Sequence, residues 1–327
     1  MRLNGIILSA VVLVVGLLAG AGARAAYPEH PIRLIVAYDA GGATDATARL
    51  LAPYIAQHLG AGAEIKVVNV SGDGGENGLA ALAGAAADGY TLGFLNAPSV
   101  VTMPIERATR YKLDQFDPLV NIIDDPAVIT VHRDDGPRTL VELLAGARAS
   151  PGSLTYGTTG VASDDHLSLL QLQHQARVEF RHVPLPGNTI NLKALLSHRT
   201  VACGQNLSEV QRVLRTEPVR VLGIMSDIRS PDAPDVPTMK EQGFNIQVSS
   251  LRGIAAPKGM PADLRARLVE AITSAALDPG FQAMARENLQ PLRVMGPEAY
   301  AATLAAMDRE FRMVWKRSPW KRAPWER

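Results

Sequence analysis

The sequence predicts an α/β fold built on a parallel sheet. Three short, mostly apolar runs, at residues 32–37, 64–70 and 90–95, are typical of buried strands. Helical patterns separate these runs, and glycine-rich turns follow the first two. Strands that alternate with helices in this way form parallel sheets with right-handed crossovers. The chain of 327 residues is long enough for two domains of this kind.

The composition excludes several classes of function. The chain has 33 Lys and Arg against 32 Asp and Glu, so it lacks the basic excess of a nucleic-acid-binding protein. Its hydrophobic content is 47% with only 5% aromatic residues, as in α/β proteins rich in alanine, valine and leucine. The single cysteine, Cys203, excludes an intramolecular disulfide and a metal site of cysteine ligands. We therefore expect no nucleic-acid partner, no metal and no cofactor.

The first 26 residues have the pattern of an export signal. Arg2 precedes an apolar run over residues 6–18, and Ala23-Arg24-Ala25 fits a cleavage site of small residues. The apolar run is short for a membrane span, although an uncleaved anchor is the alternative. We expect cleavage near Ala25 and a mature protein that is soluble in the periplasm.

The turn after the first strand, residues 40–45, has the features of an anion site. Gly41 and Gly42 let backbone N–H groups approach a ligand closely. The helix that follows adds unpaired N–H groups and about half a positive charge at its start. Thr44 or Asp45 is expected to cap this helix. The alternative is an ordinary turn between strand and helix, in which Asp45 is only an N-cap.

A second series of strands and helices occupies the middle of the chain. Its strands are expected at residues 127–131, 154–156, 179–183, 200–203 and 219–225. Residues 230–237 form a proline-rich connector, and a strand over residues 246–256 returns to the first domain. Three helices then follow, near residues 262–276, 279–288 and 298–316. The last stretch repeats tryptophan every five residues from Trp315 and is either a frayed tail or a basic, aromatic contact surface.

Two motifs invite an enzymatic interpretation. The run from Gly72 to Gly78 is close to a dinucleotide fingerprint, but Asn77 stands where G-x-G-x-x-G requires glycine. Ser163-Asp164-Asp165-His166 contains the residue types of a hydrolase, but consecutive helical residues do not face one another. No G-x-S-x-G elbow is present. We expect Ser163 to be an N-cap, followed by two acids that the helix dipole favours.

From residue 27 onward the chain resembles the Bug (TctC-like) periplasmic receptors of tripartite tricarboxylate transporters. The resemblance follows the order of the mature chain over nearly its whole length. It is carried by the stretches YPEHPIRLIVAYDAGGATDATARLLA, NVSGDGGENG, AAADGYTL, LTYGTTGVASDDHL, FRHVPLPG and SPDAPDVPTMKEQGF.

The resemblance implies a two-lobed periplasmic-binding-protein fold of the type II-like, Venus-flytrap kind, with a hinge and a central cleft. Lobe 1 would comprise residues 27–124 and 249–327, and lobe 2 residues 125–248. The implied function is capture of a small carboxylated solute, without catalysis, for membrane transporter subunits. We expect a monomer. The alternatives are an exported hydrolase or transferase that uses the same cleft, and a ligand sensor for a signalling system.

The resemblance also implies which residues contact the ligand. Its carboxylate would be held at two loops between strand and helix, residues 38–45 and 158–166, with three further residues lining the cleft. The implied ligand-binding residues are Tyr38, Asp39, Gly41, Gly42, Ala43, Thr44, Asp45, Asn96, Thr158, Thr159, Gly160, Ser163, Asp164, His166, Gly187 and Asn206. No catalytic or metal-binding residue is expected.

The chain departs from the family pattern in its charges. Asp164 and Asp165 stand where the family usually has serines, and Gln205 stands where it often has an acid. An acid in a closed cleft repels a second carboxylate and favours a donor or a cation. The sequence therefore predicts a ligand with one carboxylate plus an amine, amide or hydroxyl group, or a compact monoacid. The alternative is that both aspartates are surface caps.

Overall fold

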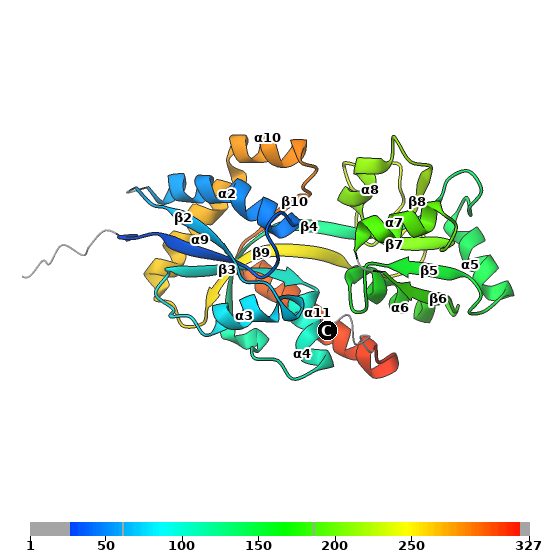
Figure 1. Ribbon diagram of the computed structural model, residues 1–327, viewed down its shortest axis with the longest axis horizontal. Coiled ribbons are helices and arrows are strands. Elements are labelled where there is room, and N and C mark those ends of the chain that lie inside the picture. Colours follow the sequence, from blue (N-terminus) through cyan, green and yellow to red (C-terminus); the bar gives the residue numbers. More distant parts are fainter. Residues whose placement is uncertain (1–26, 61, 186, 321–327) are drawn as a thin grey trace, which may run out of the picture.

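The computed structural model describes residues 27–60, 62–185 and 187–320. They form two α/β lobes side by side, and the first lobe combines both ends of the described chain (Figure 1). This confirms the expected two-lobed fold. The expected export signal and Trp325 lie outside the described residues. Within the described part of the chain, no helix has the length and apolar character needed to cross a bilayer.

The sheet of lobe 1 has a parallel core and an antiparallel continuation. The three parallel strands are, in sheet order, β2 (Ile65–Asn69), β1 (Ile32–Val36) and β3 (Thr91–Ala97). The parallel arrangement expected for the first three strands is confirmed, and the returning strand β9 (Ser249–Pro257) adds to the sheet antiparallel to β3. The helices of this lobe are α2 (Ala43–Leu59), α3 (Glu76–Ala83), α4 (Ser99–Glu106), α9 (Ala262–Leu277) and α10 (Pro279–Glu287).

Lobe 2 repeats this plan with the middle of the chain. Its parallel strands are β6 (Arg181–Pro184), β5 (Thr155–Thr158) and β7 (Ala202–Asn206). Strand β8 (Val219–Ile224) lies on the other side of the antiparallel strand that joins this sheet to lobe 1. The helices are α5 (Leu140–Ala149), α6 (Asp164–Ala176), α7 (Asn188–Leu196) and α8 (Leu207–Val213).

One long strand, β4 (Phe116–His132), belongs to both sheets. Its residues 116–126 pair with β9, and its residues 127–131 pair with β7. The sequence predicted only residues 127–131 of this strand, because these residues are mostly apolar. A further short strand, β10 (Leu292–Met295), pairs with β4 and was not expected. Backbone hydrogen bonding therefore runs without a break from one lobe to the other. The residues at which the two lobes divide remain a prediction.

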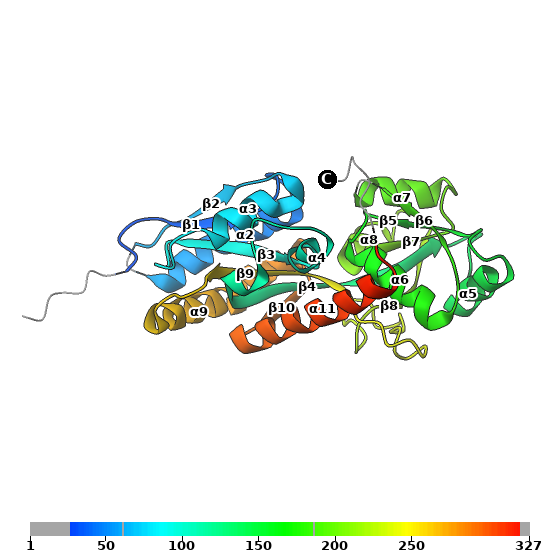
Figure 2. The same ribbon diagram turned by 90° about the horizontal axis from the view of Figure 1, so that it is seen from below.

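Helix α11 (Pro297–Arg317) runs along lobe 1, against α4 and β4, and ends beside α6 of lobe 2 (Figure 2). Its buried side chains include Tyr300, Leu304 and Phe311. Beyond its end, the indole of Trp320 is only 4% exposed and meets the ring of Trp315 edge-on at 4.6 Å. The alternative of a frayed tail is therefore wrong for the residues up to Trp320.

Two local expectations need correction. The small residues after the second glycine turn predict a helix over residues 79–87, but α3 begins three residues earlier, at Glu76, because Gly75 in the left-handed region provides its N-cap. The sequence Thr238-x-x-Glu241 also predicts a capping box at a helix start. Both hydrogen bonds of this box are present, yet the backbone there forms turns and no helix. A capping box therefore fixes a local turn even where the following residues cannot continue as a helix.

Candidate functional site

The loop between β1 and α2 is organised by Asp45. Gly42 is the N-cap of α2 and makes no side-chain cap, so the expectation that Thr44 or Asp45 caps this helix is wrong. Asp45 lies one turn further on, and its carboxylate accepts hydrogen bonds from Gly41 N at 2.8 Å and Arg49 Nε at 2.9 Å. Its second oxygen accepts from Asn69 Nδ2 at 3.0 Å.

These contacts determine the charge of Asp45. The hydrogen bond from Arg49 is the largest influence, and it lowers the pKa of the buried carboxyl to about 2, helped by Gly41 and Asn69 against the effect of burial. The carboxylate is therefore ionised at neutral pH. Because Gly41 N–H already donates to it, this N–H group has its partner within the loop.

Two further predicted residues, Asn96 and Tyr38, lie beside the first loop. Asn96 Nδ2 donates to Thr44 Oγ1 at 2.6 Å, and Asn96 Oδ1 is buried without a hydrogen bond to the described residues. The ring of Tyr38 packs over Gly75, where a Cβ would lie 3.2 Å from it. Asp39 is exposed, and its carbonyl accepts from Gly42 N at 3.3 Å.

The loop between β5 and α6 is held by hydrogen bonds among its own residues. Ser163 is the N-cap of α6, as predicted, and its hydroxyl accepts from His166 N at 3.3 Å. The same hydroxyl donates to Gly160 O at 2.9 Å. Thr158 is fully buried and pairs through Oγ1 with His182 Nε2 at 2.6 Å.

Asp165 has the role in this loop that Asp45 has in the first. One carboxyl oxygen accepts from Thr159 N at 3.0 Å and from Thr159 Oγ1 at 2.7 Å. The residue is 1% exposed, and burial, followed by the charge of Asp164, raises its pKa well above the usual range of an aspartate. Its Cβ packs against Gly204 of β7, where an added Cβ would come within 2.7 Å.

Asp164 is also buried, so the alternative of two surface caps is wrong. Asn206 Nδ2 donates to Asp164 Oδ2 at 2.6 Å, which joins two predicted residues, and burial raises the pKa of Asp164. His166 accepts from Ala162 N at 3.1 Å, and its ring stacks on His182 with centroids 4.1 Å apart. Burial lowers the pKa of His166 to about 3, so the imidazole is neutral.

The remaining predicted residues begin helices of lobe 2. Gly187 is the N-cap of α7 with φ of +91°, which favours glycine. Asn206 is the N-cap of α8 in a reciprocal capping box, in which Asn206 N donates to Glu209 Oε2 at 3.2 Å. Asn206 therefore links the start of α8 to the start of α6.

A cavity of about 440 Å³ opens where α2 and α8 face each other. Among the predicted residues, Gly41, Gly42 and Ala43 line it. Asp164 and Asp165 are not among the lining residues. The sequence did not predict the rest of the lining, which is Ala46, Thr47, Ser208, Glu209, Arg212, Arg252 and residues 287–291. A larger groove of about 920 Å³ lies between α4 and α11, away from both loops.

The lining residues that the sequence did not predict include the charged side chains of the cavity. Arg252 lies on β9 in register with Asn96, and its guanidinium makes no hydrogen bond or ion pair with the described residues. Burial raises the pKa of Glu209 to about 7, and that of Asp125 beneath it to about 6, although Arg252 lowers both. Arg212 Nη2 donates to Asn288 O at 3.2 Å and so joins the two lobes at the cavity. The sequence pattern that could have pointed to Glu209 was the capping box Asn206-x-x-Glu209.

Comparisons with known proteins agree with this architecture. A family model described as a tripartite tricarboxylate transporter family receptor matches residues 47–305. BugT of Bordetella pertussis is 33% identical over 267 residues, which cover 79% of this chain and 81% of BugT. A TctC solute-binding protein from Polaromonas is 28% identical with a TM-score of 0.81, covering 89% of this chain and 99% of that one.

A structure of an R. palustris protein with adipate is 25% identical with a TM-score of 0.74, covering 89% of this chain and 97% of that one. The family model spans most of the chain, and the two solved structures share its fold over nearly nine-tenths of its length. The chain therefore belongs to the tripartite tricarboxylate transporter (TctC, Bug) receptor family and is a solute-binding receptor.

Proposed function

We propose that this receptor captures a small organic acid in the cavity between its lobes and delivers it to the membrane subunits of a tricarboxylate-type transporter. The observation that carries the proposal is the composition of this cavity. The start of α2 lines one side, α8 lines the other, and Arg252 lies on the strand that runs between them. Two lobes that meet at a polar cavity suit ligand capture by closure. The adipate bound to the R. palustris relative supports a carboxylate as ligand.

The carboxylate of the ligand would pair with Arg252. This guanidinium is half-buried at the cavity and makes no hydrogen bond or ion pair with the described residues, although its charge acts on Glu209, Asp125 and Asp164. A planar guanidinium matches a carboxylate with two parallel hydrogen bonds. The first turn of α2 adds backbone N–H groups, at Ala43 and Thr44, that have no acceptor within the helix.

The second ligand group would be a hydrogen-bond donor. Glu209 lines the cavity, and its pKa of about 7 leaves it partly ionised at neutral pH. A second carboxylate beside Glu209 would be repelled, whereas an amine, amide or hydroxyl group would be accepted. We therefore keep the preference for a compact acid with one donor group, and assign it to Glu209 in place of Asp164 or Asp165.

The two loops would act mainly through geometry. Asp45, Asp165 and Ser163 each bind backbone groups of their own loop. We propose that they fix the loop backbone around the ligand. Direct ligand contact by residues 158–166, Asn96, Gly187 and Asn206 remains a prediction, because these residues are not among those that line the cavity.

We also propose that the receptor has no catalytic activity. The Ser163 hydroxyl and the His166 ring each have partners in the loop, and the low pKa of His166 makes it a poor general base at neutral pH. The receptor would act as a monomer in the periplasm after removal of residues 1–26. Export is supported by the basic, apolar and small-residue pattern of that segment.

Ligand binding is tested by thermal unfolding with a panel of mono-, di- and tricarboxylates, amino acids and hydroxy acids, followed by calorimetry of the hits. A ligand at a hundredfold excess over its Kd stabilises the folded state by about 2.7 kcal/mol. We expect a compact hydroxy or amino acid to give the largest shift. Arg252→Gln is expected to weaken its binding at least tenfold, because a charge-assisted pair is lost.

Arg229→Gln is the matched control, because Arg229 pairs with Glu241 on the far surface of lobe 2 and does not line the cavity. It is expected to leave the affinity unchanged. A tricarboxylate as the tightest ligand would contradict the role of Glu209. An Arg252→Gln variant that binds as tightly as the wild type would contradict the role of Arg252. Turnover of an ester or a nucleotide without any ligand shift would favour the enzyme alternative.

A further inference from the structure

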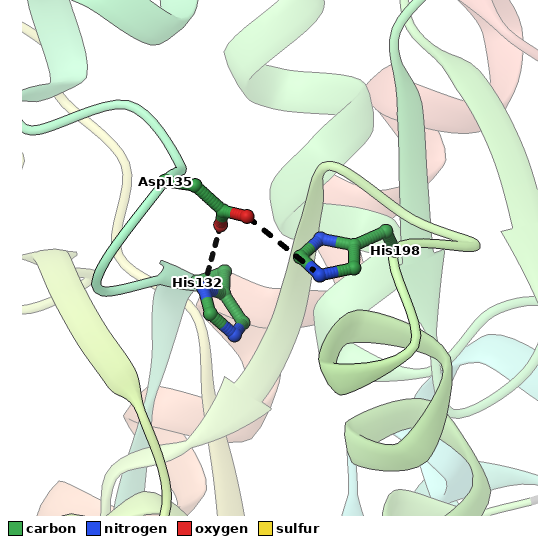
Figure 3. Close-up of side chains that lie close together, drawn as sticks. All are labelled: His132, Asp135 and His198. Carbon is green, nitrogen blue, oxygen red and sulfur yellow. Dashed lines mark ion pairs between the residues drawn. The ribbon is translucent and has the colours of Figure 1, made fainter.

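Two histidines and an aspartate meet on the surface of lobe 2, away from the ligand cavity. His132 ends β4, Asp135 follows in the next turn, and His198 follows α7. One potential ligand atom from each residue lies within 4.8 Å of the other two. Figure 3 shows the carboxyl group of Asp135 between the two rings, with one oxygen toward each. His132 Nδ1 is 2.6 Å from Asp135 Oδ1, and His198 Nε2 is 3.7 Å from Asp135 Oδ2.

The backbone holds the three side chains in place. Gly136 N donates to His132 O at 3.1 Å, which closes the turn that brings Asp135 back to His132. A Cβ on Gly136 would lie 2.5 Å from that carbonyl oxygen, so the tight turn depends on glycine. His198 has φ of +57°, a left-handed conformation in which histidine is enriched among non-glycine residues. Its N–H donates to Leu195 O at 3.0 Å and anchors it to the end of α7.

The contact between His132 and Asp135 does not have the geometry of a hydrogen bond. His132 Nδ1 is shielded from solvent and has no hydrogen-bond partner among the described residues, in spite of the carboxyl oxygen at 2.6 Å. Two lone pairs this close need a positive charge between them, which is either a proton on the ring or a metal ion. Ligand atoms around a tetrahedral Zn²⁺, with bonds of about 2.0 Å, lie about 3.3 Å apart. The two histidine nitrogens face different oxygens of Asp135, at 2.6 and 3.7 Å, and the ligand atoms of the cluster all lie within 4.8 Å of one another. A shared ion would therefore draw the exposed side chains of Asp135 and His198 closer to that spacing.

We propose that His132, Asp135 and His198 bind a first-row divalent cation of the Zn²⁺ or Cu²⁺ kind. Imidazole nitrogen suits these ions, whereas Mg²⁺ and Ca²⁺ prefer ligand sets made only of oxygen. The side chain of His132 is 14% exposed, while those of Asp135 and His198 are 61% and 59% exposed. The site thus has one sheltered ligand and two accessible ones, and water completes the coordination. A bound ion would tie the end of β4 to the end of α7, independently of the ligand cavity.

The test is calorimetry of the untagged full chain with ZnCl2, repeated with CuSO4. We expect one ion per chain. His132→Gln, Asp135→Asn and His198→Gln are each expected to weaken binding at least tenfold, since even residues that only support metal ligands change affinity 10–100-fold. His174→Ala is the matched control, because His174 is exposed on α6 outside the cluster. Electron paramagnetic resonance of the Cu²⁺ form should show hyperfine coupling to two imidazole nitrogens.

The change in unfolding temperature that the organic acid causes is measured for each variant alongside. This change is expected to equal that of the wild type. This keeps a failure of the metal site separate from a failure of the proposed receptor function, and it shows that each variant is folded. The proposal is overturned if Asp135→Asn and His198→Gln bind Zn²⁺ as tightly as the wild type. It is also overturned if His174→Ala loses as much affinity as they do. The cluster would then be a contact between the Nδ1–H group of His132 and the carboxylate of Asp135, without a metal ion.

Discussion

Asp45 and Asp165 do the same task in the two lobes with opposite electrostatics. Each is buried near the start of a helix and accepts the backbone N–H of the loop before it, from Gly41 in one case and Thr159 in the other. The pKa of Asp45 is lowered to about 2, whereas burial raises that of Asp165 well above the usual range.

The pKa of Asp165 is raised by burial and then by the charge of Asp164, and Asp165 also differs from Asp45 in the residue one turn further along the helix. Four residues after Asp45 is Arg49, whose Nε lies 2.9 Å from the carboxylate. Four residues after Asp165 is Leu169, which is buried in the core of lobe 2. A buried carboxyl without a cation loses hydration and gains little in return, so its neutral form is favoured. The backbone hydrogen bond that shapes each loop and the charge of the aspartate that accepts it are therefore determined by different neighbouring residues.

Asp45→Ala is expected to have the largest effect at neutral pH. It leaves Gly41 N–H without its acceptor and removes one of the two acceptors of Asn69 Nδ2, which also donates to Tyr38 O at 3.0 Å; the loss costs about 1–3 kcal/mol of unfolding free energy. Ligand affinity should fall as well, because Gly41 and Gly42 line the cavity. Urea unfolding and calorimetry measure the two losses.

Asp308→Ala is the control for this experiment. Asp308 forms an Asp–Arg pair of the same spacing and distance on α11, 2.9 Å from Arg312, but its carboxylate accepts no backbone hydrogen bond from the described residues. Its loss is expected to be below about 0.5 kcal/mol. Equal losses in the two variants would mean that the ion pair, and not the backbone bond, is what Asp45 contributes.

Asp165→Asn is expected to change the pH dependence of stability. A raised pKa in the folded state means that the contribution of Asp165 is fully present below the unfolded pKa near 4 and is lost as pH rises toward the folded value. The amide cannot ionise, so the variant should gain on the wild type by at most about 1.4 kcal/mol per pH unit. Urea unfolding at several pH values above 4 measures this. Parallel curves for the two proteins would show that Asp165 ionises normally.

Ser163→Ala removes the N-cap of α6 and should cost about 1 kcal/mol. Thr139→Ala removes the N-cap of α5, which accepts from Glu142 N at 3.1 Å far from either loop, and should cost a similar amount. Only the serine variant should weaken ligand binding, because Ser163 also holds Gly160 O. If both variants leave the affinity unchanged, the second loop does not shape the ligand site.

Arg49→Gln is expected to have the smallest effect on stability at neutral pH, because the side chain is half exposed and its ion pair is screened by solvent. The informative measurement is the carboxyl chemical shift of Asp45 during acid titration. The stability due to Asp45 is present above the unfolded pKa near 4 and is lost as pH falls through about 2. Removing the cation should move that loss to higher pH. An unchanged titration would assign the low pKa to Gly41 and Asn69 instead.

Local patterns predicted the parts of the fold that local contacts stabilise. The strand, glycine turn and helix from Ile32 to Leu59 follow from apolar spacing, and the N-cap at Ser163 follows from residue type and position. The first half of β4 was missed because acids and amides interrupt its apolar pattern. Their partners are distant in sequence, as in the pairs of Asp124 with Arg293 and of Asp117 with Arg265.

The candidate site shows the same limit. Arg252 and Glu209 line the cavity, but only the pairing of β9 with β3 and the packing of α8 bring them there. Asp164 and Asp165 looked like surface caps or cleft acids because acids at a helix start are common. The positions of Asn206 and Gly204, which bury them, depend on the pairing of β7 with β4.

The insertion of β9 between β3 and β4 has a consequence for how a newly made chain folds. The strands of lobe 2 are consecutive in the sequence, so its sheet can close early. In lobe 1, the free edge of β3 is paired only when β9 is present, because Gly93 pairs with Ala255, which comes much later in the sequence. Long-range pairings of this kind form slowly, and an unpaired apolar edge invites association with other chains. We therefore expect β3 to be the segment most prone to aggregate while the chain is incomplete.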